Sequence, residues 1–228
     1  MNPEKIKQLN SSYSLLTRED RLKRFYTDFP ASKILVTSSF GSTSVALLHM
    51  ISRIKPEQKI HFINTLYHFP ETISYKEKLK KTLNLSVEDV VPEPLHHQYT
   101  RENKTWSKDP DFCCSVNKVM PFAALKKNAD FWITGLIGQQ NSFRNKLSIF
   151  TEQDNLVKFN PLIDASLEDI KEYISYYSLP SHPLSPKGYS SIGCTHCTAK
   201  GKYREGRWHG KTKTECGLHL PGSAGHAY

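Results

Sequence analysis

The sequence predicts an α/β fold in which helices cover both faces of a parallel β-sheet. Short apolar runs alternate with longer amphipathic segments along residues 33–178, and this alternation is typical of parallel sheets. Beyond Pro180 the density of glycine, proline, serine and lysine rises, which indicates a loop-rich flap. A chain of 228 residues with 38% hydrophobic residues can form a full α/β core. We therefore expect an α/β domain over residues 1–180 and a C-terminal segment over residues 181–228.

The first strand and helix frame a turn of small residues. Residues 1–30 have apolar spacings that favour short helices leading into the fold. Residues 33–37 are then predicted to form a strand, residues 38–42 a turn, and residues 43–54 a helix with a heavily buried face. A strand, a small-residue turn and a helix together open a nucleotide-binding βα unit. The domain over residues 1–180 is therefore expected to bind a nucleotide.

The alternation continues through the rest of this domain. Further strands are predicted over 59–63, 87–91 and 130–134. Helices are predicted over 70–83, with Pro70 at the start, and over 117–128 despite Pro121. Ser166 is a good N-cap for a last helix running to about Ser178, where Leu179 and Pro180 stop it.

The charge of the chain indicates an anionic partner. The formal net charge is +9, which suits either a polyanion such as tRNA or a small, multiply charged nucleotide. Seven basic residues between Lys187 and Lys213 alternate with glycines, a pattern that favours a mobile cationic flap over a rigid nucleic-acid groove. We expect no nucleic-acid partner and no membrane partner. The N-terminus lacks the apolar core of a signal peptide, so we expect a cytoplasmic protein whose thiols stay reduced.

Four of the five cysteines have the spacing of metal ligands. Cys113 and Cys114 are adjacent, and Cys194 and Cys197 form a Cys-x-x-Cys pair. Both a four-cysteine zinc site and an iron–sulfur cluster use four thiolates. Adjacent cysteines cannot easily occupy two tetrahedral positions on one ion, whereas a cluster spreads its ligand positions over separate irons. The pattern therefore favours a [4Fe-4S] cluster, with zinc as the alternative.

Cys216 stands apart from these four. Lys211, Lys213 and His219 lie near it in the sequence, and positive charge favours the thiolate, which is the nucleophilic form of a cysteine. Local sequence leaves two interpretations open, a catalytic nucleophile and an incidental exposed thiol.

Several motifs occur together and in order, and they make the sequence resemble a known family. These are Ser38-Ser39-Phe40-Gly41-Ser42-Thr43-Ser44, Tyr67-His68-Phe69-Pro70-Glu71-Thr72, Cys113-Cys114 with Lys118-Val119, Gly188 through Thr198, Gly206 through Gly210, and Lys213-Thr214-Glu215-Cys216-Gly217-Leu218-His219. Over about residues 30–220 the chain resembles the assimilatory sulfonucleotide reductases, the adenylyl-sulfate and phosphoadenylyl-sulfate reductases, of the iron–sulfur type. Their fold is the PP-loop type, similar to the adenine nucleotide hydrolases.

The resemblance implies an activity and its partners. Members reduce adenosine 5′-phosphosulfate to sulfite and AMP through an S-sulfocysteine, which here would form on Cys216. This reaction belongs to sulfate assimilation and cysteine biosynthesis. Thioredoxin or a glutaredoxin-like dithiol would regenerate the cysteine. Members with both cysteine pairs generally take the nucleotide without a 3′-phosphate. Family members are commonly homo-oligomers, and we expect the same here.

The resemblance also implies a set of site residues. Lys118 and His219 would assist Cys216 in catalysis. The predicted [4Fe-4S] ligands are Cys113, Cys114, Cys194 and Cys197. The residues expected to bind the substrate are Ser38, Ser39, Phe40, Gly41, Ser44, Thr65, Arg144, Arg204 and Arg207.

The chain departs from the family pattern at several positions. Asn64 and Leu66 replace a frequent aspartate and glycine, and Ile137 and Gly138 replace a usual pair of arginines. The loss of that pair leaves individual phosphosulfate contacts less defined. The rival interpretations are a phosphoadenylyl-sulfate reductase, an iron–sulfur PP-loop tRNA thiolase and a zinc module that binds nucleic acid. The loop lacks the aspartate with which thiolases handle Mg-ATP, and a thiolase does not account for the motif around Cys216. Colour distinguishes the zinc module, because a cluster makes the purified protein brown and zinc leaves it colourless.

Overall fold

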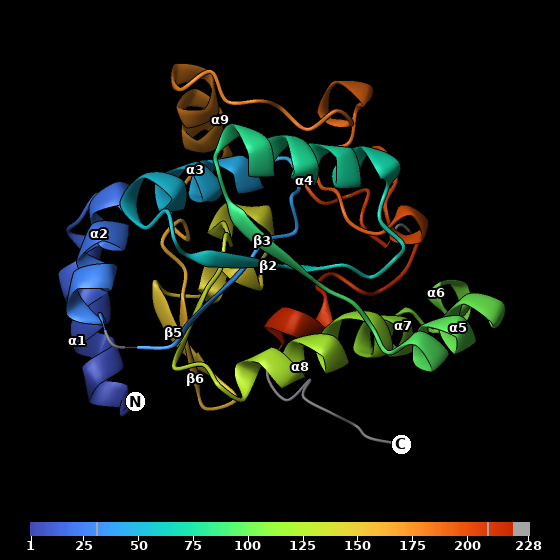
Figure 1. Cartoon of the computed structure of the whole chain (residues 1–228), viewed down its shortest axis with the longest axis horizontal. Coiled ribbons are helices and arrows are strands. Elements are labelled where there is room, and N and C mark those ends of the chain that lie inside the picture. The colour runs from blue at the N-terminus through green and yellow to red at the C-terminus, as the bar shows by residue number, and fades with distance from the viewer. Residues whose placement is uncertain (31, 209, 221–228) are drawn as a thin grey trace.

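A mostly parallel sheet forms the centre of the fold, as the sequence predicts (Figure 1). The computed structural model describes residues 1–30, 32–208 and 210–220. Within these residues the sheet has six strands in the order β3-β2-β1-β4-β6-β5, and only β5 runs antiparallel to its neighbour. The strands are β1 (Ile34–Thr37), β2 (Lys59–Ile63), β3 (Ser86–Val90), β4 (Phe131–Ile133), β5 (Phe150–Gln153) and β6 (Leu156–Phe159).

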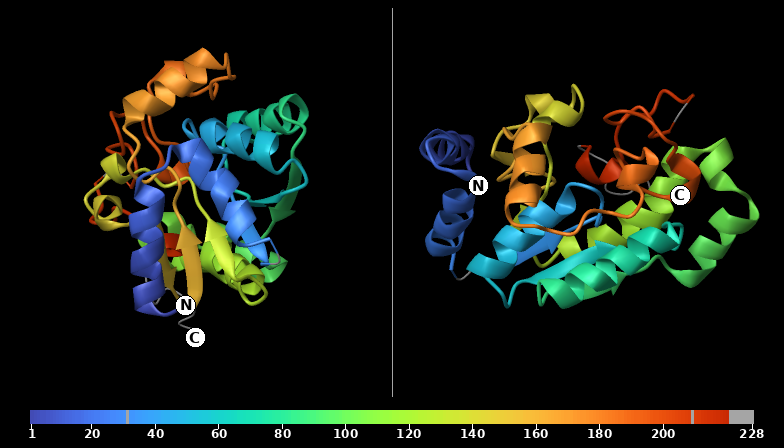
Figure 2. Two further views of the ribbon diagram at one scale, coloured as in Figure 1. Left: turned by 90° about the vertical axis from the view of Figure 1, so that its left-hand side faces the viewer. Right: turned by 90° about the horizontal axis from the view of Figure 1, so that it is seen from above.

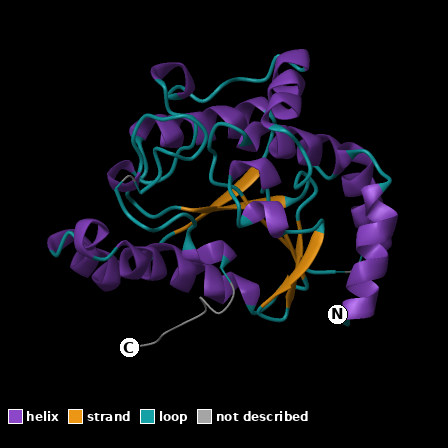
Figure 3. Cartoon of the chain, turned by 180° about the vertical axis from the view of Figure 1, so that it is seen from behind, coloured by secondary structure: helices purple, strands orange, loops and turns teal. Residues whose placement is uncertain are grey.

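Helices lie on both sides of this sheet, as predicted (Figure 3). Ser166 caps the last helix and forms a capping box with Asp169, which confirms the predicted start. Helices α1 and α2 stand at one end of the molecule, and α5 to α7 extend from the other (Figure 1). The α-helices are α1 (Pro3–Ser14), α2 (Arg18–Asp28), α3 (Ser44–Ile54), α4 (Pro70–Thr82), α5 (Pro94–Glu102), α6 (Thr105–Lys108), α7 (Pro110–Cys114), α8 (Met120–Lys126) and α9 (Leu167–Tyr176).

The two faces of the sheet bury different residues because side chains alternate along each strand. Val36 and Ile133 point into the larger core, which α1 to α4 and α9 cover. Leu35 and Trp132 belong to a second cluster on the opposite face, which includes Phe122 of α8. Leu218, far along the chain, packs against this second cluster. The smaller face is therefore covered partly by α8 and partly by the C-terminal segment.

One predicted helix has a different form. The sequence predicts a continuous α-helix over residues 117–128, but Ser115–Val119 forms a π-helical turn between α7 and α8. Pro121 is the second residue of α8, so its missing N–H falls where the hydrogen-bond pattern changes from π-helical to α-helical. Short π-helical turns are frequent at functional sites. Here the turn carries Lys118 and directly follows the two adjacent cysteines.

The segment after α9 crosses the molecule toward its opposite end and then returns to the sheet, where Leu218 and Leu220 contact Gln153. Figure 2 shows it passing from α9 toward α5 to α7, and the ammonium of Lys211 donates a hydrogen bond to the carbonyl of Ser107. Its secondary structure is limited to short helical turns and isolated bridges. His209 and residues 221–228, which the motifs and the predicted C-terminal segment include, lie outside the described residues. No helix among the described residues is both long and apolar enough to cross a bilayer.

Candidate active site

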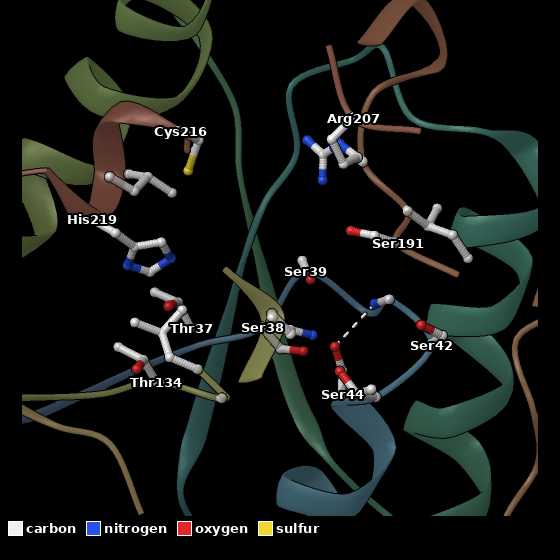
Figure 4. A pocket seen from close by; sticks show the side chains of 18 of the residues that line it. Thr37, Ser38, Ser39, Ser42, Ser44, Thr134, Ser191, Arg207, Cys216 and His219 are labelled. Atoms are coloured by element: carbon white, nitrogen blue, oxygen red, sulfur yellow. Dashed lines mark hydrogen bonds between the residues drawn. The ribbon is translucent and has the colours of Figure 1, made fainter. Parts of the chain in front are cut away.

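An open cavity lies where β1 and β4 end, and most of the predicted site residues line it (Figure 4). Its walls come from the serine loop Ser38–Ser44, from the segment after β4, from the π-helical turn and from the C-terminal segment. The carboxyl ends of parallel strands are the usual place for a ligand in such a fold. Of the residues predicted from the sequence, the cavity is lined by Ser38, Ser39, Gly41, Ser44, Lys118, Arg144, Arg204, Arg207, Cys216 and His219.

The serine loop presents the N-terminus of α3 to the cavity. The hydroxyl of Ser44 accepts a hydrogen bond from the Gly41 N–H at 3.0 Å, and Ser42 donates one to the carbonyl of Ser190 at 2.8 Å. Thr43 precedes the helix and makes no side-chain cap. The first N–H groups of α3 therefore lie near a wall of small hydroxyl side chains. A helix start of this kind is suited to a phosphate.

Two residues predicted to bind the substrate do not line the cavity. Phe40 is fully buried and packs edge-on against Phe62 with 5.5 Å between ring centroids, because its positive φ turns the side chain into the core. Thr65 is also buried, and its hydroxyl lies 3.2 Å from the sulfur of Cys194. Phe40 therefore supports the serine loop from the core side, and Thr65 contacts a predicted cluster ligand.

Cys216 faces the serine loop across the cavity. Figure 4 shows its sulfur on the side opposite Ser42, with the Arg207 guanidinium on the far wall. Lys118 also lines the cavity. Burial by itself would lower the pKa of Lys118, but the nearby sulfurs of Cys194, Cys114 and Cys216 raise it above its ordinary value. Lys118 therefore remains a cation beside both the single cysteine and the cysteine pairs.

Glu215 organises the cations beside Cys216, and the sequence analysis did not identify this role. The carboxylate accepts hydrogen bonds from Arg144 at 2.6 and 3.0 Å, from Arg204 at 3.2 Å and from the Cys216 N–H at 3.0 Å. Burial would raise the pKa of Glu215, but the ion pair with Arg144 holds it well below the usual range. Arg144 and Arg204 line the cavity, yet each is already paired. The contact of Glu215 with Arg144 spans 71 residues, so local sequence carries no sign of it.

The position of the Arg207 side chain requires a glycine at residue 193. Its guanidinium lies against Gly193 so closely that a Cβ atom there would be 2.6 Å from the guanidinium carbon. The same group lies over the Trp208 ring at 4.5 Å and donates a hydrogen bond to the Cys197 carbonyl at 3.3 Å. Within the described chain, no carboxylate forms an ion pair with it. Arg207 can thus offer its charge to an anion in the cavity.

His219 lies at the floor of the cavity. Its ring stacks on Trp132 with 5.2 Å between centroids and 8° between planes. Burial, and then the nearby charge of Lys158, place its pKa well below the ordinary value, so the ring is neutral near pH 7. The neutral ring supports the turn that carries Cys216. It adds no positive charge beside the thiol, contrary to what proximity in the sequence suggests.

The four predicted cluster ligands gather at one side of the cavity. Cys113 and Cys194 belong to one buried cluster, and Cys197 packs against it. Burial raises the pKa of Cys113, and the sulfurs of Cys194 and Cys197 add to that effect. Burial also raises the pKa of Cys114 to about 12. Thiols held in this way become stable thiolates only with a compensating positive charge.

The four predicted ligands all supply sulfur, the donor atom with which cysteines hold an iron–sulfur cluster. Among the described residues, no three His, Cys, Asp or Glu side chains surround one point where a metal ion could bind. Cys113, Cys194 and Cys197 come from two segments and pack with Tyr67 and Trp106. The ring of His196 stacks on Trp106 at 4.0 Å between centroids. Four cysteine thiolates are the usual ligand set of a [4Fe-4S] cluster.

Sequence comparison finds many similar proteins. Residues 33–200 match the phosphoadenosine phosphosulfate reductase domain. A protein of Bacillus cereus strain Q1, named adenosine 5′-phosphosulfate reductase, is 37% identical over 198 residues, covering 82% of this chain and 84% of its own. A protein of the same name from Bacillus mycoides strain KBAB4 is 36% identical, with the same coverage of both chains.

Solved structures show the same fold. The phosphoadenylyl-sulfate reductase of Candida auris, solved with phosphate, superposes with a TM-score of 0.77 at 26% identity, covering 87% of this chain and 98% of its own. The FMN adenylyltransferase of Candida glabrata, at 15% identity and a TM-score of 0.57, covers 87% of this chain and 74% of its own. At that identity the second similarity concerns the fold alone.

Proposed function

The chain belongs to the phosphoadenosine phosphosulfate reductase family, and we propose that it reduces adenosine 5′-phosphosulfate to sulfite, releasing AMP. The observation that carries the proposal is the position of the Cys216 thiol, which opens into the same cavity as the serine loop at the start of α3. A nucleotide phosphate at that loop would leave its sulfate end directed toward the cysteine. Sulfate assimilation, leading to cysteine biosynthesis, is the setting we propose, and the cytoplasm its place.

The first step is a transfer of the sulfo group. The Cys216 thiolate attacks the sulfur of the sulfate, and the bond from that sulfur to the bridging oxygen of the phosphate breaks. AMP leaves with the electron pair, and an S-sulfocysteine remains on the enzyme. Both partners of this step are anions, so positive charge must offset their repulsion and the charge that grows on the leaving phosphate.

Lys118 and Arg207 are the cations proposed for this task. Both line the cavity, and within the described residues neither forms an ion pair with a carboxylate. We assign Arg144 and Arg204 a different first role. Their guanidinium groups hold Glu215, whose carboxylate in turn accepts a hydrogen bond from the N–H of Cys216. They therefore fix the position of the nucleophile while adding positive potential to the cavity.

A dithiol completes the reaction. One thiolate of thioredoxin or a glutaredoxin-like protein attacks the Cys216 sulfur, and sulfite leaves with the electrons of the sulfur–sulfur bond. The second thiol then resolves the mixed disulfide, which returns Cys216 as a thiol and leaves the reductant oxidised. We propose that the loop-rich segment 181–228 carries the nucleophile to this partner, while residues 1–180 bind the nucleotide. A homo-oligomeric state is also part of the proposal.

We propose that a [4Fe-4S] cluster is held by Cys113, Cys114, Cys194 and Cys197. The cluster would supply a fixed charge that orients and electrostatically tunes the site, with Lys118 beside it. Two of these cysteines lie at the end of α7 and two lie in the C-terminal segment, so the same ligands would join the two segments. The burial of three of the four sulfur-bearing residues supports this assignment.

We further propose a preference for the nucleotide without a 3′-phosphate. A 3′-phosphate brings close to two negative charges and needs dedicated donors, ideally a bidentate arginine. Ile137 and Gly138 stand where many relatives of this family have arginines, and Ile137 is fully buried. The test compares kcat/KM for both nucleotides with one reductant at matched ionic strength. A ratio at or below one for adenosine 5′-phosphosulfate would overturn the preference without touching the role of Cys216.

The test of the main proposal is sulfite release by the purified protein. With adenosine 5′-phosphosulfate and a dithiol, the wild type should release sulfite and AMP in equal amounts. Cys216→Ser should release neither above background while retaining the iron content of the wild type, because Cys216 is not a proposed ligand. Sulfite release by Cys216→Ser at the wild-type rate would contradict the proposed chemistry.

A further inference from the structure

Lys158 is a buried cation that the reaction described above does not use. It lies on β6, is 1% exposed, and faces the smaller core beside Trp132, its register partner on β4. Its ammonium lies 4.9 Å from the centre of the Trp132 ring. It donates a hydrogen bond to the side-chain oxygen of Gln153 at 3.1 Å. A lysine is rarely buried this fully without a carboxylate partner, so its place calls for a physical reason.

Gln153 connects this lysine to the C-terminal segment. Its amide oxygen accepts the bond from Lys158, and its amide nitrogen donates to the carbonyls of Leu218 and Leu220 at 3.0 and 3.1 Å. One side chain at the end of β5 thus binds two carbonyls of the turn that follows Cys216. Both the oxygen and the nitrogen of the Gln153 amide therefore have hydrogen-bond partners. Because Lys158 can only donate, its bond fixes the amide oxygen toward the lysine and the nitrogen toward the turn.

Trp132 supports the same turn from the sheet. The ring of His219 stacks on it, and the side chain of Leu218 packs in the apolar cluster to which it belongs. Its indole N–H donates to Thr37 at 2.8 Å, which fixes the ring relative to β1. The turn therefore rests on Trp132 and is tied through its carbonyls to Gln153. Glu215 fixes the other side of Cys216 through Arg144.

We propose that Lys158 and Gln153 are positioning residues, which seat the turn Cys216–Leu220 on the sheet and so hold the nucleophile at the cavity. This inference rests on the proposed function for its catalytic consequence, but the seating itself does not. Neither residue lines the cavity. They act through the turn, and their loss should leave the substrate-binding walls in place.

The charge of Lys158 makes the seating of the turn dependent on pH. Burial lowers the pKa of Lys158 to about 8, and the charges of Cys216 and Glu215 oppose part of that shift. The other charged groups acting on it are Arg144 and Lys126, and it acts in turn on His219. A lysine with a lowered pKa is charged below about 8 and neutral above it. The ammonium that binds Gln153 and faces the Cys216 thiolate is therefore lost on the alkaline side.

The experiment uses two variants and one control in the full-length, iron-loaded protein. Lys158→Met keeps the length of the apolar chain and leaves no buried charge, so we expect it to fold. Gln153→Leu removes both bonds to the turn. Lys127→Met is the matched control, because Lys127 ends α8 on this side of the sheet, is exposed, and is not among the charges that act on Lys158. Hydrogen exchange of the peptide containing residues 216–220, measured without substrate, reports the seating directly.

In both variants we expect faster exchange of that peptide, with the control unchanged. Formation of the S-sulfo adduct in a single turnover should be slower by about 10- to 100-fold, the usual cost of a displaced reacting group. The ratio of the wild-type rate to the Lys158→Met rate should fall as the pH rises through about 8, because ionisation of the Cys216 thiol affects both proteins alike and cancels in the ratio. Unchanged exchange in both variants, or identical pH profiles for wild type and Lys158→Met, would overturn the proposal. A wild type that forms no adduct would instead refute the proposed function. The exchange data would still decide whether Lys158 and Gln153 seat the turn.

Discussion

The guanidinium of Arg144 donates two hydrogen bonds to the carboxylate of Glu215, at 2.6 and 3.0 Å. This ion pair connects the segment after β4 to the residue before the nucleophile. Both side chains are buried. Arg204 and Asn141 also donate to this carboxylate, at 3.2 Å each. Glu215 is therefore one point at which the C-terminal segment is attached to the rest of the fold.

Glu215→Gln should destabilise the protein and slow adduct formation. Removing one partner of a buried ion pair leaves the other charge uncompensated, which typically costs about 3–5 kcal/mol. The free energy of unfolding, measured with denaturant, checks this. Glu205→Gln is the control, because Glu205 lies in the same segment but is exposed. Equal stabilities for the two variants would contradict the fastening role of Glu215.

The same pair fixes the pH range of this contribution. Because the folded pKa of Glu215 is well below the usual range, its stabilisation is fully present above the unfolded value of about 4.3 and is lost as the pH falls toward the folded value. The stability difference between wild type and Glu215→Gln should therefore be constant from neutral pH to about 5 and shrink below about 4. A stability difference between the two proteins that grows as the pH falls would contradict a lowered pKa of Glu215.

Gly193→Ala should impair catalysis while leaving the fold intact. The new methyl group would displace the Arg207 guanidinium, which is the mobile end of a long side chain and can move at little cost. We expect slower adduct formation, close to that of Arg207→Ala. A double-variant cycle measures the coupling, and the double variant should be no slower than Arg207→Ala alone. Additive losses would show that Gly193 acts through something other than Arg207.

Lys118→Ala should reduce the rate of adduct formation without preventing folding. Removing one well-placed donor from a site where charge develops typically costs about 10²- to 10³-fold in rate. Rapid-quench single-turnover kinetics give the measurement. Lys127→Ala is the control, because Lys127 is an exposed lysine on the neighbouring helix end. Unchanged kinetics in Lys118→Ala would remove this residue from the reaction.

Cys113→Ser should lose iron and destabilise the C-terminal segment. Since Cys113 packs with Cys194, a cluster held by both would tie the segment to α7. Iron analysis and the visible absorption of anaerobically purified protein check the first effect, and hydrogen exchange over residues 190–208 checks the second. Cys216→Ser serves as the control and should keep its iron. Full iron content in Cys113→Ser would contradict the four-ligand proposal.

Local patterns predicted much of the fold but not the contacts that complete the site. β2 occupies the predicted residues 59–63, because a short apolar run between polar flanks has few alternatives. The hairpin of β5 and β6 was missed, since Asp154 and Asn155 form a tight turn within a mixed polar and apolar stretch. Most residues that the motifs single out line the cavity, but the motifs do not indicate the orientation of Phe40, which has a positive φ.

The residues that hold the nucleophile in place could not be predicted from the sequence, for a different reason. Glu215 contacts Arg144, 71 positions away, and Gln153 contacts Leu218, 65 positions away. A glutamate or a glutamine in a polar stretch looks like surface until the chain folds back on the sheet. Tertiary structure determines which distant polar residues pair, so these contacts are seen only in the folded protein.

The most direct test of the account is the mass of the Cys216 peptide after incubation with adenosine 5′-phosphosulfate in the absence of reductant. Anaerobically purified protein should gain one sulfo group, located on Cys216, and release one equivalent of AMP. Addition of a dithiol should remove the group and yield sulfite. A sulfo group on Cys194 or Cys197, or stoichiometric AMP release with Cys216 unmodified, would contradict the account.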